Sequence, residues 1–341
     1  MNKLFGLGLL ALILFFPACS CSTGEALIEE AVPAAGISGG NSLPPVFIDC
    51  KPVSGLEIDF QFSMPVKLVS LNFSPALKVE STVEGKVLQV MLQEAAPPGD
   101  KFTADVLVED EWGNTLNVLI PFRARNDRIP SFLITEIRTE YSKPKAEFIE
   151  LHTLSAGDMG AVRLIIAGYT KNPLVYEFSG MEVAEGEYIL IHLRKIEAAS
   201  LDELSSDLEE SPGTDAIAGA RDLWIPGTEK LIHKTDAIYF LDQDDRVIDG
   251  IMLSENPDAW WSKEHFVQAA EFLHKQGAWK SASGKIPGPQ DAVISYNIKT
   301  AMTRSLSRIE TEADTNTAAD WYICATGAAT PGKPNNPKRF E

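Results

Sequence analysis

The amino-acid sequence predicts an all-β protein made of two β-sandwiches in tandem, the second of which carries helical insertions. Three observations support this fold class. Apolar and polar residues alternate with a period of two over many short segments. Turn-forming residues separate these segments at short intervals. The chain has 341 residues, which is enough for two domains and a leader. The expected boundaries are a leader over 1–18, an anchor and tether over 19–45, and sandwiches over 46–125 and 131–335.

A short apolar run opens the chain. It extends from Leu4 to Phe16, follows the positive charge of Lys3, and precedes Cys19 and Cys21. The run is too short for a transmembrane helix, which needs about 20 apolar residues, and it is typical of a cleaved export signal. Because it ends on cysteine, it resembles the signal of bacterial lipoproteins, in a relaxed form similar to that of spirochaetes.

This resemblance implies cleavage before a cysteine that carries diacylglycerol, which we expect at Cys19, with Cys21 as the alternative. An ordinary secretory signal remains the other interpretation. Two or more acyl chains hold a protein stably on a membrane. The Gly-, Pro- and Ser-rich stretch to residue 45 cannot bury a core and indicates a flexible tether. We therefore expect a protein of the cell envelope, on the inner or outer membrane, with the outer membrane or the cell surface favoured.

The charge balance narrows the range of partners. The chain has 48 acidic and 30 basic residues, a net charge of -18. A protein that binds nucleic acid needs a basic face for the phosphates, so nucleic acid is not expected as a partner. The acidity itself favours solubility, and binding of a cationic ligand or calcium is the alternative interpretation.

Residues 46–125 show the strand pattern most clearly. Over 56–62, apolar residues alternate with acidic and amide residues, which predicts a strand with one solvated face. The turn at 63–65 ends this strand. Several short strands within about 80 residues are typical of an immunoglobulin-like sandwich. The segment from Asp105 to Asn114 resembles the late hairpin of bacterial Ig-like domains, "V-x-D-x-x-G-N", and this resemblance implies a spacer domain. The further expected strands lie at 66–73, 77–80, 87–92, 102–108 and 115–122.

The boundary segment 126–130 is followed by five motifs that resemble those of the lamin-tail domain, in the same order. This resemblance, which spans about 131–335, implies a second Ig-like sandwich. The motifs are Ile134–Ile137 with Glu147–Leu151 ("I-x-E-I … E-(F/W)-I-E-L"), Gly186 with Tyr188–Ile191 ("G-x-Y-x-V-I"), Ala237–Gly250 ("L-x-D-x-x-G-x-x-V-D"), Ser305–Arg308 ("S-L-x-R"), and Asp320–Tyr322 with Thr330–Asn335 ("D-W … T-P-G-x-x-N").

Two insertions distinguish the second half from that family. The first, near 195–235, is acidic and weakly helical in composition. The second, near 256–277, predicts an amphipathic helix capped by Asn256, with Pro257 in its first turn and Gly277 at its end. We expect this helix to cover an open face of the sandwich, and binding of a partner is the alternative. Its apolar face consists of Phe266, Ala269, Ala270 and Leu273.

No catalytic motif is present, and we predict that the protein is not an enzyme and needs no cofactor. A carboxylate pair for acid–base catalysis could be imagined among Glu136, Glu147 and Glu150. Their expected positions on strands indicate a structural role instead. The acidic hairpin from Asp242 to Asp249 is interpreted as a solvated turn, with calcium binding as the alternative. Cys50 and Cys324 are a candidate disulfide in an exported chain, with two buried thiols as the alternative.

Tryptophans give the strongest indication of a binding site. Trp260, Trp261 and Trp224 lie in the insertions, where exposed indoles stack on sugars or anchor a protein partner. Packing of the insertions onto the sandwich is the alternative. The leading hypothesis is a membrane-anchored, non-enzymatic binding, adhesion or scaffold protein with a protein or glycan partner. The alternatives are an envelope assembly factor that docks through its helical insertion and a metal-dependent hydrolase that uses acidic residues of the sandwich rim.

Overall fold

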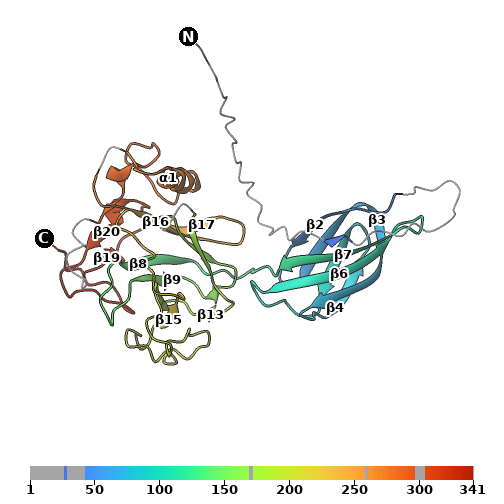
Figure 1. Ribbon diagram of the computed structural model, residues 1–341, viewed down its shortest axis with the longest axis horizontal. Coiled ribbons are helices and arrows are strands. Elements are labelled where there is room, and N and C mark those ends of the chain that lie inside the picture. Colours follow the sequence, from blue (N-terminus) through green and yellow to red (C-terminus); the bar gives the residue numbers. More distant parts are fainter. Residues whose placement is uncertain (1–26, 29–42, 169–171, 258–259, 296–303, 341) are drawn as a thin grey trace, which may run out of the picture.

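The computed structural model describes residues 27–28, 43–168, 172–257, 260–295 and 304–340. Within these ranges the chain is mostly β-sheet with a single α-helix, so the predicted all-β class is confirmed at that level. Figure 1 shows two β-rich parts that lie side by side and are joined by a narrow connection. We call them the N-terminal part, up to residue 125, and the C-terminal part, from residue 130.

The N-terminal part contains a sheet with the order β1-β7-β6-β3-β5-β4, in which β2 also pairs with β3. Its strands alternate between buried and solvated side chains, so that one face of each strand enters a common hydrophobic core. In β6, for example, Phe102, Ala104, Val106 and Val108 are all buried. The strands are β1 (Leu27–Ile28), β2 (Phe47–Pro52), β3 (Glu57–Ser74), β4 (Val79–Val83), β5 (Gly85–Leu92), β6 (Lys101–Glu109) and β7 (Thr115–Arg123).

Strand β3 differs from the prediction of two strands separated by a turn at 63–65. It is continuous over 18 residues. It pairs with β5 up to Val66 and with β6 from Lys67 onward, with a shift of register between Gln61 and Val66. Pro65 has no N–H to donate, and it is tolerated here because the ladder is irregular where the strand changes partners. Strand β1 lies inside the expected tether and pairs with β7, so that β1 forms the edge of this sheet.

The C-terminal part contains a six-stranded sheet, a five-stranded sheet and the short pair β10–β13. Residues from both large sheets, such as Ile134, Ile149, Ile166, Ile238 and Ile251, belong to one hydrophobic core. The six-stranded sheet has the order β15 (Arg221–Trp224), β14 (Tyr188–His192), β9 (Phe148–Thr153), β8 (Phe132–Arg138), β19 (Leu306–Arg308) and β20 (Trp321–Ile323). The five-stranded sheet has the order β12 (Leu174–Glu177), β11 (Arg163–Ile166), β16 (Asp236–Leu241), β17 (Val247–Ser254) and β18 (Val293–Ile294); the pair is β10 (Gly157–Asp158) with β13 (Glu182–Val183).

Helix α1 (Glu264–Gln276) contacts β16 and β17. Its buried residues are the four predicted for the apolar face, and Gly277 ends it with a left-handed φ of 73°. The predicted start at Asn256 is wrong, because the helix begins at Glu264 with Lys263 at its cap. The chain just before the helix is held by Trp261, whose indole donates to the Pro287 carbonyl. Among the helices of the described residues, none has the length and apolar content needed to cross a membrane.

The first insertion contains no α-helix between residues 195 and 235, so the predicted weak helicity is wrong. Two of its acidic residues instead accept hydrogen bonds from backbone N–H groups of the sheet. Asp202 accepts the N–H of Trp224 at 2.7 Å, and Glu203 accepts the N–H of Asp222 at 2.7 Å. Both N–H groups belong to β15, which is the edge of its sheet. The carboxylates therefore satisfy donors that an edge strand leaves without a partner.

The two parts touch at close range. A Cβ atom on Gly160 would lie 2.2 Å from the Pro98 carbonyl oxygen. The buried Asn126 side chain donates to the carbonyls of Asp158 and Gly160 at 2.7 and 2.8 Å, and Arg125 pairs with Asp244 at 2.8 Å. Close packing and directed hydrogen bonds at one junction fix the orientation of one part against the other.

Candidate functional site

The structure separates the three tryptophans that were predicted as binding residues. Trp224 on β15 is buried, stacks on His192 with 3.8 Å between ring centroids, and donates to the Ser211 hydroxyl. Trp260 is 84% exposed. Strand β15 and helix α1 lie at opposite sides of the C-terminal part in Figure 1, so Trp224 does not contribute to a site with the other two.

The lining of a hollow of about 540 Å³ includes Ser262 and Lys263, which directly follow Trp260 and Trp261 in the chain. We call it the lysine hollow. Phe266, one of its lining residues, contacts the indole of Trp261 with 6.0 Å between ring centroids. The hollow lies between the segment before β16, the end of β17 and the start of α1. Its lining residues are Gly168, Lys230, His233, Lys234, Thr235, Glu255, Ser262, Lys263 and Phe266.

Three lysines give the lysine hollow a positive character. Lys234 lies 3.6 Å from Glu255, and Lys230 lies 3.4 Å from Glu140, which is outside the hollow. Burial lowers the pKa of His233, and the positive charges of Lys230 and Lys263 lower it further. His233 is therefore neutral near pH 7, while the ammonium groups attract an anion.

Asp236 holds two lining residues of the lysine hollow in place. Its carboxylate is fully buried and accepts the backbone N–H groups of Gly168 at 2.7 Å and His233 at 3.0 Å. Burial raises the pKa of Asp236 to about 7. A Cβ atom on Gly168 would lie 2.7 Å from this carboxyl group, so only glycine fits there. These contacts hold Gly168 and His233, and hence two sides of the hollow, in fixed positions.

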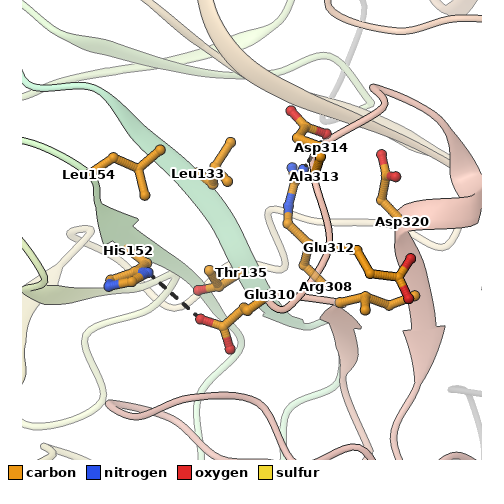
Figure 2. Close-up of a pocket in the computed structure, with 11 residues that line it drawn as sticks. Leu133, Thr135, His152, Leu154, Arg308, Glu310, Glu312, Ala313, Asp314 and Asp320 are labelled. Atoms are coloured by element: carbon orange, nitrogen blue, oxygen red, sulfur yellow. Dashed lines mark hydrogen bonds and ion pairs between the residues drawn. The ribbon is translucent and has the colours of Figure 1, made fainter.

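A second, smaller hollow of about 130 Å³ has an acidic lining, shown in Figure 2. Several of its charged groups have partners within the protein. Arg308 pairs with Asp314 at 2.7 Å, and Glu310 faces His152 at 3.7 Å and accepts the Tyr188 hydroxyl at 2.9 Å. This hollow is therefore a structural junction between β8, β9 and the chain after β19.

The acidic hairpin between β16 and β17 is also occupied by contacts within the chain. Asp244 pairs with Arg125, Asp245 with Arg163 at 2.6 Å, and Asp249 with Arg308 at 2.7 Å. In the described ranges, no group of three or more His, Cys, Asp or Glu side chains is arranged to hold a metal ion. Asp242 accepts the backbone N–H groups of Asp244 and Arg246, and the other three hairpin carboxylates form ion pairs. The alternative of calcium binding receives no support from these contacts.

Glu136 and Glu150 are buried on the six-stranded sheet, and Glu147 is buried just before its strand β9 rather than on a strand as predicted. None of the three lines either hollow. Glu147 forms a two-bond pair with Arg194 at 2.6 and 2.7 Å. Glu136 and Glu150 are cross-strand neighbours that accept N–H groups of Thr330 and Gly332. Burial raises the pKa of Glu136 to about 6, and burial and the adjacent Glu136 raise that of Glu150 well above its usual value.

The two cysteines of the candidate disulfide lie in different parts of the molecule. Cys50 belongs to the N-terminal core. Cys324 is buried in the C-terminal part, where its sulfur lies 3.2 Å from the Ser305 backbone nitrogen. The candidate bridge between them is not formed in this structure, because each side chain is packed in its own part. The predicted lipidation residues, Cys19 and Cys21, lie outside the described residues.

Lys230, Lys234 and Lys263 belong to no recognisable sequence motif and were not predicted as site residues. These lysines are distant in sequence, and only the packing of α1 against β16 and β17 brings them together. A weak signal was present, because Lys230, His233 and Lys234 form a basic cluster within a strongly acidic chain. Proximity of this cluster to the tryptophan pair could not be predicted without the fold.

Two comparisons with known proteins gave a match. The family model TP_1001_2nd, described as "protein second domain", matches residues 130–323. A protein of Treponema pallidum (strain Nichols) named "Uncharacterized protein" is 28% identical over 227 residues. The alignment covers 64% of this chain and 56% of that protein, so the chain spans little more than half the length of this relative.

Proposed function

This chain belongs to the TP_1001_2nd family, and we propose that it is a lipid-anchored, non-enzymatic binding protein of a bacterial cell envelope. The proposal extends to the fold: two Ig-like sandwiches in tandem, the second similar to the lamin-tail domain. The segments with lamin-tail motifs form strands of the two large sheets, namely β8, β9, β14, β16, β17, β19 and β20. The relaxed lipoprotein signal and the relative from Treponema pallidum favour a spirochaete as the source.

The observation that carries the binding role is the exposure of Trp260 beside a hollow with three lysines. An indole that is 84% exposed is costly to keep in water, and exposed tryptophans are enriched where proteins bind partners. A hollow of about 540 Å³ is within the size range of small-molecule sites. The N-terminal part acts as a spacer that holds this site away from the membrane.

The anchor can be tested in the organism that makes the protein. Detergent-phase partition of the wild-type chain should be lost in Cys19→Ala and kept in Cys21→Ala, because only the lipid-bearing cysteine becomes the new N-terminus. The reverse result would move the lipid to Cys21. Partition that survives both substitutions, or a signal peptide that remains attached, would contradict the lipid anchor.

Protease treatment of intact cells then places the protein on one side of the outer membrane. Digestion without lysis would support an adhesive or binding role at the surface. Digestion only after lysis, with a periplasmic control protein intact beforehand, would direct the search to partners within the envelope.

An envelope assembly factor is the alternative proposal, in which α1 docks another protein. Its four apolar residues are buried against the sandwich, so docking would have to use the outer face of the helix. Crosslinking in cells from a photoreactive residue at Glu271, which is exposed on that face, tests this alternative. A reproducible protein adduct there would favour the assembly role over binding at the lysine hollow.

A further inference from the structure

We propose that the lysine hollow and Trp260 together bind an acidic polysaccharide, a chain of sugars that carry carboxylate or sulfate groups. This inference rests on the proposed binding function and names the class of ligand. It is carried by three features of the same region: the charge of the hollow, the looseness of its ion pairs, and the neighbouring exposed indole.

The charge of the hollow is opposite to that of the chain. The protein has a net charge of -18, yet the lining of the hollow contains Lys230, Lys234 and Lys263 and one carboxylate, Glu255. Two further carboxylates lie behind the lining: Glu140 pairs with Lys230, and the buried Asp236 accepts from Gly168 and His233. At physiological ionic strength, charges farther than about 8 Å apart are largely screened. A bound anion therefore responds mainly to the local lysines, and the distant acidic surface adds only a weak repulsion.

The lysines of the hollow are only loosely engaged. Lys230 and Lys234 lie 3.4 and 3.6 Å from their carboxylate partners, beyond the usual charge-assisted hydrogen-bond distance of about 2.7–2.9 Å. Lys263 lies over the ring of Phe266 at 5.9 Å and forms no direct ion pair with a described carboxylate, although its charge lowers the pKa of the buried Asp236. Arg308, by contrast, holds Asp249 at 2.7 Å. Ligand anions can thus replace the partners of the lysines at small cost.

Trp260 supplies the second type of contact that a sugar chain uses. The indole presents a flat apolar face, which packs against the C–H groups of a sugar ring. Trp260 precedes Ser262 of the hollow by two residues, and Trp261 between them is fixed to Pro287 at 2.9 Å. The exposed indole is therefore attached next to the hollow at a fixed point of the backbone.

The lysines of the hollow together with the exposed Trp260 indole favour a glycan over other anions. A free phosphate or sulfate ion would use the lysines but not the indole. Nucleic acid carries a charge on every phosphate, about one per 1.7 Å of duplex, and would meet repulsion from the acidic surface around the small basic region. An acidic polysaccharide, whose charges are separated by whole sugar rings, offers both anionic groups for a few lysines and ring faces for one indole.

The test measures binding of polygalacturonate oligosaccharides to the full chain in detergent, with neutral dextran of equal size as the control. Titration calorimetry at 50, 150 and 500 mM NaCl gives the affinity and its dependence on salt. We expect binding to polygalacturonate that weakens as salt rises, because lysine contacts to anions are screened, and no binding to dextran.

Variants locate the site. Lys263→Gln should weaken binding about three- to tenfold, since one exposed charge contact is lost, and Trp260→Ala should weaken it about tenfold through loss of the stacking surface. Lys275→Gln, at the exposed far end of α1, and Trp112→Ala, in the N-terminal part, are the matched controls. Both should change the affinity less than twofold.

Besides a failure to bind any glycan, four results would overturn the proposal. They are affinity for polygalacturonate that is unchanged in Lys263→Gln and Trp260→Ala, equal binding of dextran, tighter binding of a single-stranded oligonucleotide, and full competition by inorganic phosphate alone. Failure to bind any glycan would remove this inference, while the lipid anchor and the envelope location would still be decided by the partition and protease experiments.

Discussion

Glu136 and Glu150 are cross-strand neighbours on β8 and β9, and both are buried beneath residues 330–332. Glu136 accepts the Ser305 hydroxyl and the Thr330 N–H, and Glu150 accepts the Gly332 N–H at 2.6 Å. Two carboxylates this close in a dry site cannot both ionise without cost. The pair therefore binds a proton more tightly in the folded chain than in the unfolded chain.

Stability should fall as the pH rises from 5 to 8. The pKa of Glu136 rises from 4.5 to about 6 on folding, and that of Glu150 also rises. An acid with a raised folded pKa contributes most stability below its unfolded pKa and loses it as the pH passes through the folded pKa. We expect the free energy of unfolding to drop by roughly 1–3 kcal/mol over this range, measured by urea unfolding of the C-terminal part.

The substitution Glu150→Gln should flatten this dependence and leave stability at pH 8 equal or higher, because it removes one charge and its repulsion of Glu136. Asp236, whose pKa burial raises to about 7, acts with the same sign, so some slope should remain. Glu185→Gln, on the exposed surface, is the control. A steeper slope in Glu150→Gln than in the wild type would contradict this account.

Arg308→Ala should destabilise the protein by about 3–5 kcal/mol, because it leaves a buried carboxylate without its partner. Arg308 pairs with the buried Asp249 at 2.7 Å and donates from Nε to the Ile134 carbonyl at 2.6 Å. Its other partner, Asp314, is 22% exposed. Asp314→Asn should therefore cost less than about 1 kcal/mol. Urea midpoints of both variants provide the measurement, and equal losses would contradict the different roles of the two carboxylates.

Local pattern predicted much of the fold. The alternation of residues in β5, β6 and β7 was visible in the sequence because each of these strands has one buried and one solvated face. The continuity of β3 was not visible in the sequence, because Pro65 favours a turn by local preference. The strand accommodates Pro65 only because it changes partner strands there. Likewise, the acidic insertion scored as weakly helical because local composition does not reveal that Asp202 and Glu203 serve the edge of β15.

The site was less accessible to sequence analysis than the fold. Exposure of a tryptophan depends on tertiary packing, so Trp260 and Trp224 looked alike in sequence although one is solvated and the other is in the core. The three lysines of the hollow share no local period. They meet because Lys230 and Lys234 precede β16 while Lys263 precedes the helix that packs on β16 and β17.

Gly160→Ala should loosen the junction between the two parts. An added Cβ would lie 2.2 Å from the Pro98 carbonyl, a backbone atom that cannot move aside as a side chain can. Overpacking of this kind costs about 1–3 kcal/mol. We expect faster proteolysis in the connecting segment 126–130 and a larger radius of gyration by X-ray scattering.

The control for the junction is Gly85→Ala, where the nearest atom would lie at an ordinary contact distance of 3.6 Å. It should leave both proteolysis and scattering unchanged. Scattering curves of Gly160→Ala that superimpose on those of the wild type would show that the junction tolerates the added methyl group.

Removal of Trp224 should lower the stability of the protein strongly, and removal of Trp260 should hardly change it. Trp224→Ala should cost about 3–5 kcal/mol, because a buried indole leaves a cavity and its stacking on His192 at 3.8 Å is lost. The packing around it is tight, since a Cβ on Gly213 would lie 2.8 Å from the indole ring. Trp260→Ala should change stability by less than about 0.5 kcal/mol, as an exposed side chain makes few contacts.

Thermal unfolding measures both effects, and acrylamide quenching of tryptophan fluorescence provides an independent check. The quenchable fraction should decrease in Trp260→Ala, which removes an exposed indole, and increase in a Trp224→Phe variant, which removes a buried indole and keeps the core filled. A large stability loss in Trp260→Ala would mean that this indole packs onto the sandwich, and it would also remove the aromatic contact on which polysaccharide binding at the lysine hollow depends.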